Sequence, residues 1–336
     1  MKTLNVLFTV TILAFVMTGC GTKRQYFQPE ALSGKVNYDG TLSSSIVDSV
    51  REGATLADGH VITKKGVSGV ILPAGFSYLT EDKNRYVAVS RCGDVSIIDD
   101  KNTVVFTQKL NGTIASAALK DNLLAIVLGS NELALIDIKD GKHLLHIKQD
   151  DVFVLDSRIA SPYFLGDLIV FPTLDGKLVI VDEKTRKPIR DVVVSNEKFF
   201  GNIIYLQVLG DRLVAATKKK VVSINPKSMA FLEEDVKDVI VLENRIFVFT
   251  KDGRVILTDA DLKVLKERKF SFATFSGTIH GDFVYMIEKS GYIIATDLDL
   301  ISVNVYQLPD EIETHMFTTS DTLFYKNHFF KLNRKK

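Results

Sequence analysis

Cysteine and tryptophan are the scarcest residue types in this 336-residue chain, which has two cysteines and no tryptophan. The disulfide frameworks that stabilise small secreted domains need several cysteine pairs, so this chain cannot have one. If Cys20 is modified as predicted below, Cys92 has no partner for a disulfide. Because Cys92 precedes Gly93 at a predicted hairpin tip, we interpret it as a small turn residue rather than a reactive thiol.

Catalytic and metal-binding motifs are also missing. The sequence contains no HExxH, CxxC, P-loop or GxSxG pattern. His143 and His146 are three positions apart, which in an extended segment places the two imidazoles on opposite sides of a sheet. We therefore predict no catalytic residue, no cofactor and no metal site.

Neither sign of charge is in excess, since 42 Lys and Arg residues accompany 41 Asp and Glu residues. This balance disfavours nucleic acid and an anionic membrane surface as bulk electrostatic partners. The remaining composition, 46% hydrophobic and 25% charged, is that of an ordinary globular protein.

Long apolar runs are absent except at residues 4–17, which follow Lys2 and precede Thr18-Gly19-Cys20. A basic start, a short apolar run and small residues are typical of a secretory signal, and the run is short for a membrane span. The site resembles a bacterial lipobox, although Met17 replaces the usual Leu. We predict a signal peptide over residues 1–19, lipidation of Cys20 by acyl chains such as palmitate, and a linker over residues 20–33. The alternatives are a secreted protein with an incidental cysteine and an uncleaved membrane anchor.

The clearest structural pattern lies in residues 158–196. Two apolar runs, 168–171 and 178–181, are joined through Asp175-Gly176, a pair that favours a hairpin turn. Adding an inner strand at 159–164 and an outer strand at 189–194 gives a four-stranded sheet. Because the middle strands are apolar at consecutive positions, both of their faces must be covered. Copies of the sheet stacked side by side would cover them.

The pattern does repeat along the chain. A polar residue closes the second apolar run at intervals of 34 to 45 residues, at Asp99, Asp137, Asp182, Asn225, Asp259, Asp297 and Asn333. We interpret the recurring Asp and Gly-Asp positions as turn caps rather than as an acidic cluster; they include Asp167, Asp182, Asp211, Asp259, Asp282 and Asp297. A period near 40 with four strands predicts an all-β fold, a β-propeller of four-stranded antiparallel blades over residues 34–336.

The number of blades depends on the two ends of the propeller. Residues 58–72 look like a short first blade, and the last blade lacks an outer strand. A strand within residues 34–42 would complete the last blade and close the ring. We favour eight blades; seven result if the short blade merges with the C-terminal strands.

The run from Ile159 to Arg190 resembles a PQQ-like propeller repeat: small residues before a Gly-Asp turn, an apolar strand, an Asp-Gly hairpin, a second strand ending in Asp, and a Thr-x-Lys turn. PQQ-like β-propeller lipoproteins such as BamB share this pattern. Such repeats commonly carry a blade-docking Trp, and quinone-dependent members are said to hold their cofactor with one. This chain has no Trp, so the resemblance gives no support for a cofactor.

The resemblance implies a noncatalytic protein-interaction scaffold in outer-membrane β-barrel assembly. Its partners would be outer-membrane assembly proteins or other envelope proteins, and it would be a monomeric subunit of a complex. Because Gly21 and Thr22 follow Cys20 instead of Asp, sorting in enteric bacteria implies the outer membrane, with the propeller facing the periplasm and held by the lipid anchor alone.

Five basic residues in predicted turns are candidate partner contacts: Lys218, Lys219, Lys220, Arg186 and Lys187. Ordinary solvated turns are the alternative interpretation. The alternative function is a ligand-binding or enzymatic propeller with its site in the central channel. That function needs polar side chains on the inner strands, yet residues 159–164 and 203–209 are largely apolar.

Overall fold

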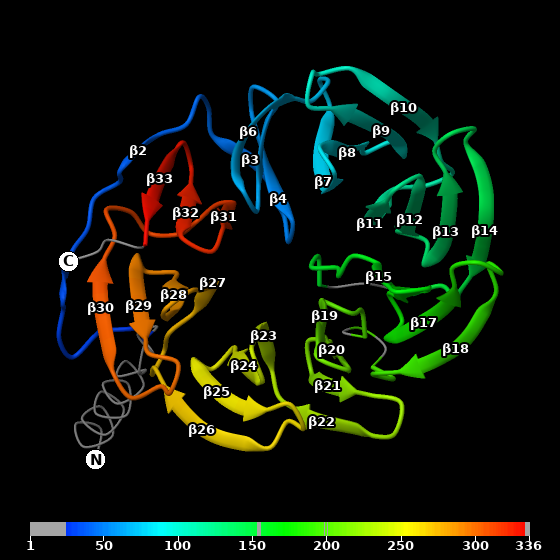
Figure 1. Ribbon diagram of the computed structural model, residues 1–336. Helices are drawn as coiled ribbons and strands as arrows, with labels where there is room; N and C mark the ends of the chain where they lie inside the picture. Colours follow the sequence, from blue (N-terminus) through cyan, green and yellow to red (C-terminus); the bar gives the residue numbers. More distant parts are fainter. Residues whose placement is uncertain (1–24, 153–155, 198, 200, 333–336) are drawn as a thin grey trace, which may run out of the picture.

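The computed structural model describes residues 25–152, 156–197, 199 and 201–332 of the chain. The predicted signal peptide and Cys20 lie outside the described residues. Strands β3 to β33 and the short strands β1 and β2 form eight sheets arranged as a ring (Figure 1). The fold is therefore an eight-bladed all-β propeller, which confirms the favoured prediction.

Each blade is a meander whose strands we call a to d, from the channel outward (Figure 1). Blades 1 and 2 contain β3 (Ile46–Val50), β4 (Gly53–Leu56), β5 (His60–Thr63) and β6 (Gly66–Ile71), then β7 (Phe76–Asp82), β8 (Arg85–Ser90), β9 (Asp94–Asp99) and β10 (Val104–Lys109). Blades 3 and 4 contain β11 (Ile114–Lys120), β12 (Leu123–Leu128), β13 (Glu132–Asp137) and β14 (Lys142–Lys148), then β15 (Tyr163–Leu165), β16 (Leu168–Pro172), β17 (Lys177–Asp182) and β18 (Pro188–Val193).

The second half of the ring repeats this order. Blades 5 and 6 contain β19 (Tyr205–Leu209), β20 (Arg212–Ala216), β21 (Lys220–Ile224) and β22 (Met229–Glu233), then β23 (Val236–Leu242), β24 (Arg245–Thr250), β25 (Arg254–Asp259) and β26 (Val264–Lys269). Blades 7 and 8 contain β27 (Phe275–His280), β28 (Val284–Glu288), β29 (Tyr292–Thr296) and β30 (Val303–Gln307), then β31 (Met316–Thr318), β32 (Thr322–Tyr325) and β33 (His328–Lys331).

The N-terminal segment closes the ring, as predicted. Strand β2 (Gly40–Thr41) pairs antiparallel with β33 and supplies the outer strand of blade 8. Strand β1 (Gly34–Lys35) also adds to β30 of blade 7 in parallel. The first and last parts of the described chain are therefore joined across two blades, which covers sheet edges that would otherwise be exposed.

Two details of the strand predictions are wrong. Blade 1 is a complete four-stranded sheet rather than a short one, because β3 and β4 precede the predicted strands, and the seven-blade alternative fails. The sequence predicts the inner strand of blade 4 at residues 159–164, but this strand lies at Tyr163–Leu165. Pro162 has no backbone N–H to donate to a neighbouring strand. The N–H of Ala160 donates instead to the carbonyl of Ile203, which leads into the next blade, at 2.9 Å.

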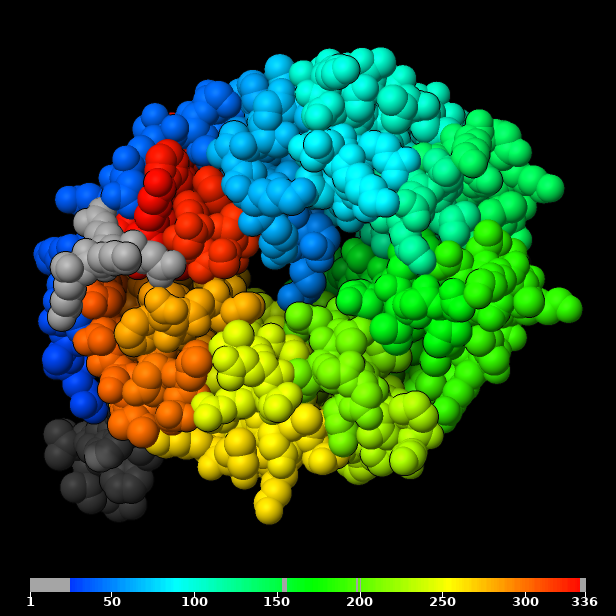
Figure 2. All heavy atoms as spheres, in the orientation of Figure 1, coloured from blue at the N-terminus to red at the C-terminus, as the bar shows by residue number. Residues whose placement is uncertain are grey.

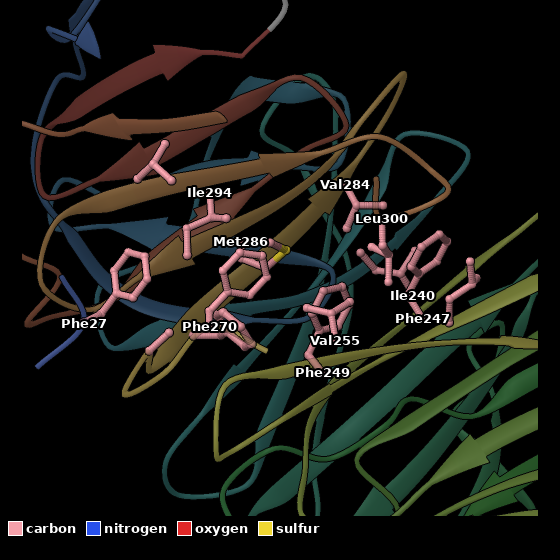
Figure 3. Packing of buried hydrophobic residues seen from close by; sticks show 14 residues of the cluster. Phe27, Ile240, Phe247, Phe249, Val255, Phe270, Val284, Met286, Ile294 and Leu300 are labelled. Carbon is pink, nitrogen blue, oxygen red and sulfur yellow. The ribbon is translucent and has the colours of Figure 1, made fainter. Parts of the chain in front are cut away.

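The hydrophobic core lies between neighbouring blades. Between blades 6 and 7, Phe249 and Phe275 meet edge to face with ring centroids 6.1 Å apart. Figure 3 shows Phe249, Phe270 and Met286 in this cluster. Phe27, from the predicted linker, belongs to this cluster and is 7% exposed. Its ring centroid lies 5.6 Å from that of Tyr292. Phenylalanine and aliphatic side chains thus fill the interface between these blades. At least this part of the N-terminal segment is docked on the propeller.

The recurring polar residues that end strand c act as turn caps, as predicted for Asp182, Asp259 and Asp297, whereas the side chain of Asp167 pairs with Lys184. Each accepts a backbone N–H from a residue two to five positions later, and those described are Asp99, Asp137, Asp182, Asn225, Asp259 and Asp297. Asn333 lies outside the described residues. These side chains are committed to the turns that join strands c and d.

A second recurring device is a glycine at the turn between strands b and c. In five blades this glycine has φ between +82° and +88°, and its carbonyl accepts a backbone N–H from the end of strand d: Gly59, Gly93, Gly176, Gly253 and Gly291. A Cβ atom there would lie 2.3 to 2.8 Å from a backbone oxygen. Only glycine fits both the dihedral angle and the space.

Within the part of the chain that the structure describes, there is no helix with the length and apolar character needed to cross a membrane.

Candidate functional site

The two ends of the ring carry different turns. Because antiparallel strands alternate in direction, all a–b and c–d turns lie at one end, which we call the a–b rim. The b–c turns and the connections between blades lie at the other end, which we call the b–c rim. The turn that carries a candidate residue therefore shows on which rim that residue lies.

The structure does not bring the five predicted contact residues together. Lys218 and Lys219 form the b–c turn of blade 5, and Lys220 begins β21. Arg186 and Lys187 form the c–d turn of blade 4, which is on the opposite rim. A single partner face at either end of the ring could therefore use only part of this set.

Several of these residues have intramolecular partners. Lys219 Nζ lies 2.5 Å from Asp235 Oδ1, and Lys220 Nζ lies 3.1 Å from Glu233 Oε1. Arg186 has φ +60° and its Nη1 donates to the carbonyl of Glu183. Exposed ion pairs of this kind contribute little to stability, so partner binding could rearrange them at small cost.

An apolar groove lies between the outer strands of blades 4 and 5. It encloses about 320 Å³ and is lined by Val193, Val194, Ser195, Asn196, Lys220, Met229 and Phe231. The exposed fractions are 62% for Phe231, 47% for Val193 and 45% for Met229. Large apolar side chains this accessible, gathered in one depression, are typical of a contact surface. We call it the blade 4–5 groove.

Charged side chains lie in the central channel. The β3–β4 hairpin of blade 1 reaches toward the middle of the ring (Figure 2). At its tip, Arg51 Nη2 lies 2.8 Å from Asp238 Oδ1 on β23 of blade 6. The guanidinium also lies 4.8 Å from the centroid of the Tyr205 ring on blade 5. One side chain of blade 1 therefore links blades 5 and 6 across the channel.

Asp238 is held from several sides. Thr278 Oγ1 donates to Asp238 Oδ2 at 2.7 Å, and the N–H of Val239 donates to Oδ1 at 2.9 Å. Burial raises the pKa of the Asp238 carboxyl, but the charge of Arg51 and these hydrogen bonds outweigh burial and hold the pKa below its ordinary value. Asp238 is therefore ionised at neutral pH.

Other titratable groups lie near this pair. Burial lowers the pKa of Lys64, which lies 4.9 Å from the centroid of the Phe317 ring. Burial and then the charge of Lys64 lower the pKa of His280, at the end of β27. A neutral histidine beside an ammonium group is the expected result of this arrangement.

A second group of charges lies at the b–c rim. Arg158 is fixed by Asp156, with Nε at 2.9 Å from Oδ1, and its Nη1 donates to the carbonyl of Lys237. Burial and then Lys251 lower the pKa of Lys218, and burial and then Arg158 lower the pKa of Lys237. The carboxylates of Asp156 and Asp238 lie near these cationic groups and act in the opposite direction on the pKa of Lys237.

The sequence did not reveal these channel charges. The segments that the sequence suggests for the channel wall, 159–164 and 203–209, are apolar, whereas the charges come from the β3–β4 turn and from Lys237-Asp238. A β-bulge between Val236 and Asp238 interrupts the alternation of β23. The available signal was a charged pair inside an otherwise apolar first strand.

No set of three or more His, Cys, Asp or Glu side chains among the described residues is placed to hold a metal ion. His143 Nε2 lies 3.0 Å from Gln108 Nε2, and His146 Nε2 lies 2.8 Å from Glu132 Oε2. The two histidines thus have separate partners.

Stability should depend on pH through Asp238. Because its folded pKa lies below the unfolded value near 3.8, the ionised group stabilises the fold above that pH, and the contribution disappears as pH falls through the folded pKa. We expect Asp238→Asn to lower the free energy of unfolding at pH 7 and the difference from wild type to shrink toward pH 2. Urea unfolding between pH 7 and 2 measures this, and a constant difference would contradict it.

Comparisons with known proteins identify the family. The family model described as outer membrane protein assembly factor BamB matches residues 48–300. Plasminogen-binding protein PgbB of Helicobacter pylori strain J99 is 31% identical, over 98% of this chain and 70% of the relative. PgbB of strain 26695 is 30% identical, over 98% of this chain and 69% of the relative. These relatives support a role in protein interaction.

Solved structures agree on the fold. BamB from Moraxella catarrhalis has a TM-score of 0.67 at 15% identity, covering 86% of this chain and 98% of its own. The computationally designed Ika8 protein has a TM-score of 0.65 at 12% identity, covering 88% of this chain and 99% of its own. Likenesses at this identity show the propeller and nothing finer. Because the family model matches residues 48–300, the chain belongs to the outer membrane protein assembly factor BamB family.

Proposed function

We propose that this protein is a noncatalytic protein-interaction scaffold of the bacterial envelope that serves outer-membrane β-barrel assembly. In this proposal the chain is lipidated at Cys20, anchored in the outer membrane and exposed to the periplasm. The sequence around Cys20 and the family support the location, and the name of the family supports the assembly role. The observation that carries the interaction role is the blade 4–5 groove.

The groove has the features that an extended partner segment requires. Strand β18 is the last strand of its sheet, so its outer edge has no neighbouring strand in that sheet. Val193 at the end of β18 and Phe231 on β22 present apolar side chains beside this edge. An added strand would gain backbone hydrogen bonds from β18 and an apolar pocket for its side chains.

One of the predicted contact residues lines this surface. Lys220 lies in the groove, with Nζ 5.2 Å from the centroid of the Phe231 ring. Its charge would favour a partner segment with an acidic residue beside its apolar ones. Arg186 and Lys187 precede β18 at the end away from Val193 and are not among the residues that line the groove. Lys218 and Lys219 lie on the b–c rim and are not among the residues that line the groove.

The relatives suggest a second candidate partner. Two proteins that are 30% and 31% identical over 98% of this chain bear the name plasminogen-binding protein. If the protein is exposed on the cell surface instead of the periplasm, plasminogen is the candidate partner, and the same groove is the surface to test. Purified plasminogen added to the immobilised protein separates this candidate from envelope partners.

A crosslinked pull-down of the tagged lipoprotein from its native envelope tests the proposal. We expect enrichment of barrel-assembly subunits with the wild-type protein and their loss with Phe231→Asp, which places a charge in the groove. Leu265→Asp is the matched control, because Leu265 is 55% exposed on β26 of blade 6 and outside the groove. Equal recovery with both variants would reject the groove, and recovery of no envelope protein would reject the scaffold.

A separate variant tests the proposed lipid anchor at Cys20. Cys20→Ala should abolish acylation and release the protein from the membrane fraction, because acyl chains supply the membrane affinity. Mass spectrometry of the mature N-terminus reads the modification directly. An unmodified Cys20 in the wild-type protein would contradict the lipidation.

A further inference from the structure

The segment that follows the predicted lipidation site is docked on the propeller. Residues 27–41, which we call the N-terminal strap, run along the outside of blades 7 and 8 (Figure 1). The strap begins with Phe27, buried between blades 6 and 7, and continues through β1 on β30 and β2 on β33. Between these points the N–H of Ser33 donates to the carbonyl of Val305 at 2.7 Å. The chain is therefore held from Phe27 onward.

Side chains hold the strap as well as backbone. The hydroxyl of Tyr38 donates to Asp310 Oδ2 at 3.0 Å, and Lys326 Nζ lies 3.1 Å from the other oxygen of the same carboxylate. The ring of Tyr38 stacks on that of His328, with centroids 4.6 Å apart. The docked position of the strap thus has several independent contacts.

Docking at Phe27 shortens the tether to any lipid at Cys20. Only residues 21–26 lie between Cys20 and Phe27. A fully extended chain covers at most about 3.3–3.6 Å per residue, so Cys20 lies within about 25 Å of Phe27. A linker free as far as Ser33 would reach nearly twice as far and would leave the orientation open. Anchoring at Cys20 would bring the bilayer to blades 6 and 7, with blades 2 and 3 on the far side of the ring (Figure 1).

An unusual aromatic residue lies on this side. Phe272 belongs to the connection between blades 6 and 7, which also supplies Phe270 and Ala273 to the cluster around Phe27. It has φ +65° and is 54% exposed. Leu262 and Leu300 also have positive φ, but both are buried and so gain contacts in the core. Phe272 has the backbone strain without the burial, which points to a contact outside the chain.

A second exposed aromatic residue accompanies it. Tyr26 directly precedes Phe27 and is 60% exposed. The ring of Phe27 meets that of Tyr292, the first residue of β29, which places this end of the strap at the b–c rim. The connection that carries Phe272 lies on the same rim. Aromatic side chains are favoured at the boundary between lipid and water.

We propose that the b–c rim of blades 6 and 7, with Tyr26 and Phe272, rests on the headgroup region of the bilayer that holds the acyl chains. The short tether brings this rim to the membrane, and the two aromatic side chains supply the contact. The inference rests on the proposed lipidation of Cys20. It adds an orientation, since the lipid alone would not decide which face of the propeller meets the membrane.

Tryptophan fluorescence of the lipoprotein in vesicles tests this surface. Because the chain has no Trp, Phe272→Trp gives a single probe, and Phe283→Trp is the matched control. Phe283 is an exposed residue in the a–b turn of the same blade 7, on the opposite rim. In vesicles of phosphatidylethanolamine and phosphatidylglycerol with a nitroxide on some headgroups, we expect quenching at position 272 to be at least about twofold stronger than at position 283.

A longer tether separates the role of the strap from that of the aromatic residues. A Gly-Ser insertion after Thr22 that doubles the tether leaves the folded propeller unchanged and should weaken the quenching at position 272. Mass spectrometry of the same preparations reports the lipid on Cys20. An unmodified Cys20 would overturn the anchor and this surface together. Acylated protein with equal quenching at both positions, or with stronger quenching at position 283, would overturn the surface alone.

Discussion

Asp238→Ala is expected to lower the free energy of unfolding by about 3 kcal/mol, because it leaves Arg51 in the channel without its carboxylate. Both side chains of the pair are largely enclosed, with exposed fractions of 30% for Arg51 and 22% for Asp238. The bond from Thr278 loses its acceptor at the same time. Since whole domains are stable by only about 5–15 kcal/mol, this is a large fraction of the total.

The matched control is Asp167→Ala. Asp167 pairs with Lys184 at 2.7 Å, but both side chains are well exposed, with fractions of 67% and 74%. The same change of residue should therefore cost less than about 1 kcal/mol. Urea unfolding at pH 7 compares the two variants with wild type. Equal losses would show that the channel pair does not help to hold the ring together.

Gly253→Ala is expected to destabilise the propeller by about 3 kcal/mol, from backbone strain and a steric collision together. Gly253 has φ +82°, and a Cβ atom would lie 2.3 Å from the carbonyl oxygen of Phe270. The turn would have to move away from the outer strand, which breaks the hydrogen bond from the N–H of Phe270 to the Gly253 carbonyl. Thermal unfolding followed by circular dichroism measures the loss.

Gly69→Ala controls for the change of residue. Gly69 lies in β6, its φ is outside the left-handed region, and an added methyl group would have no atom within 4 Å. We expect a change of less than about 1 kcal/mol, of either sign. If Gly253→Ala were as mild as Gly69→Ala, the recurrent b–c glycines would not be structural requirements of the blade.

The repeat could be predicted because its determinants are local. The apolar runs at 168–171 and 178–181 lie inside β16 and β17, and Asp182 accepts the N–H of Thr185 as expected of a turn cap. Each blade repeats such signals, so the period and the fold class follow from the sequence. The bounds of the inner and outer strands are harder to predict from the sequence. Strand β15, for example, is short because Pro162 interrupts the backbone ladder.

The candidate sites depend on contacts between distant segments, which no local pattern reports. Arg51 and Asp238 are 187 positions apart, and they meet only because the ring places blades 1 and 6 across the channel. The blade 4–5 groove similarly joins Val193 to Phe231 from different blades. The sequence predicted Arg186, Lys187 and Lys220 as contact residues, but the structure places only Lys220 in the apolar groove.

Photocrosslinking from position 231 in the native envelope tests the central claim, a protein-interaction scaffold that uses the blade 4–5 groove. A photoreactive amino acid at Phe231 is compared with one at Leu265, since both are exposed apolar positions on outer strands. We predict a discrete adduct with an outer-membrane assembly protein from position 231 and none from position 265. No adduct at position 231, or the same adducts from both positions, would contradict the proposed role of the groove.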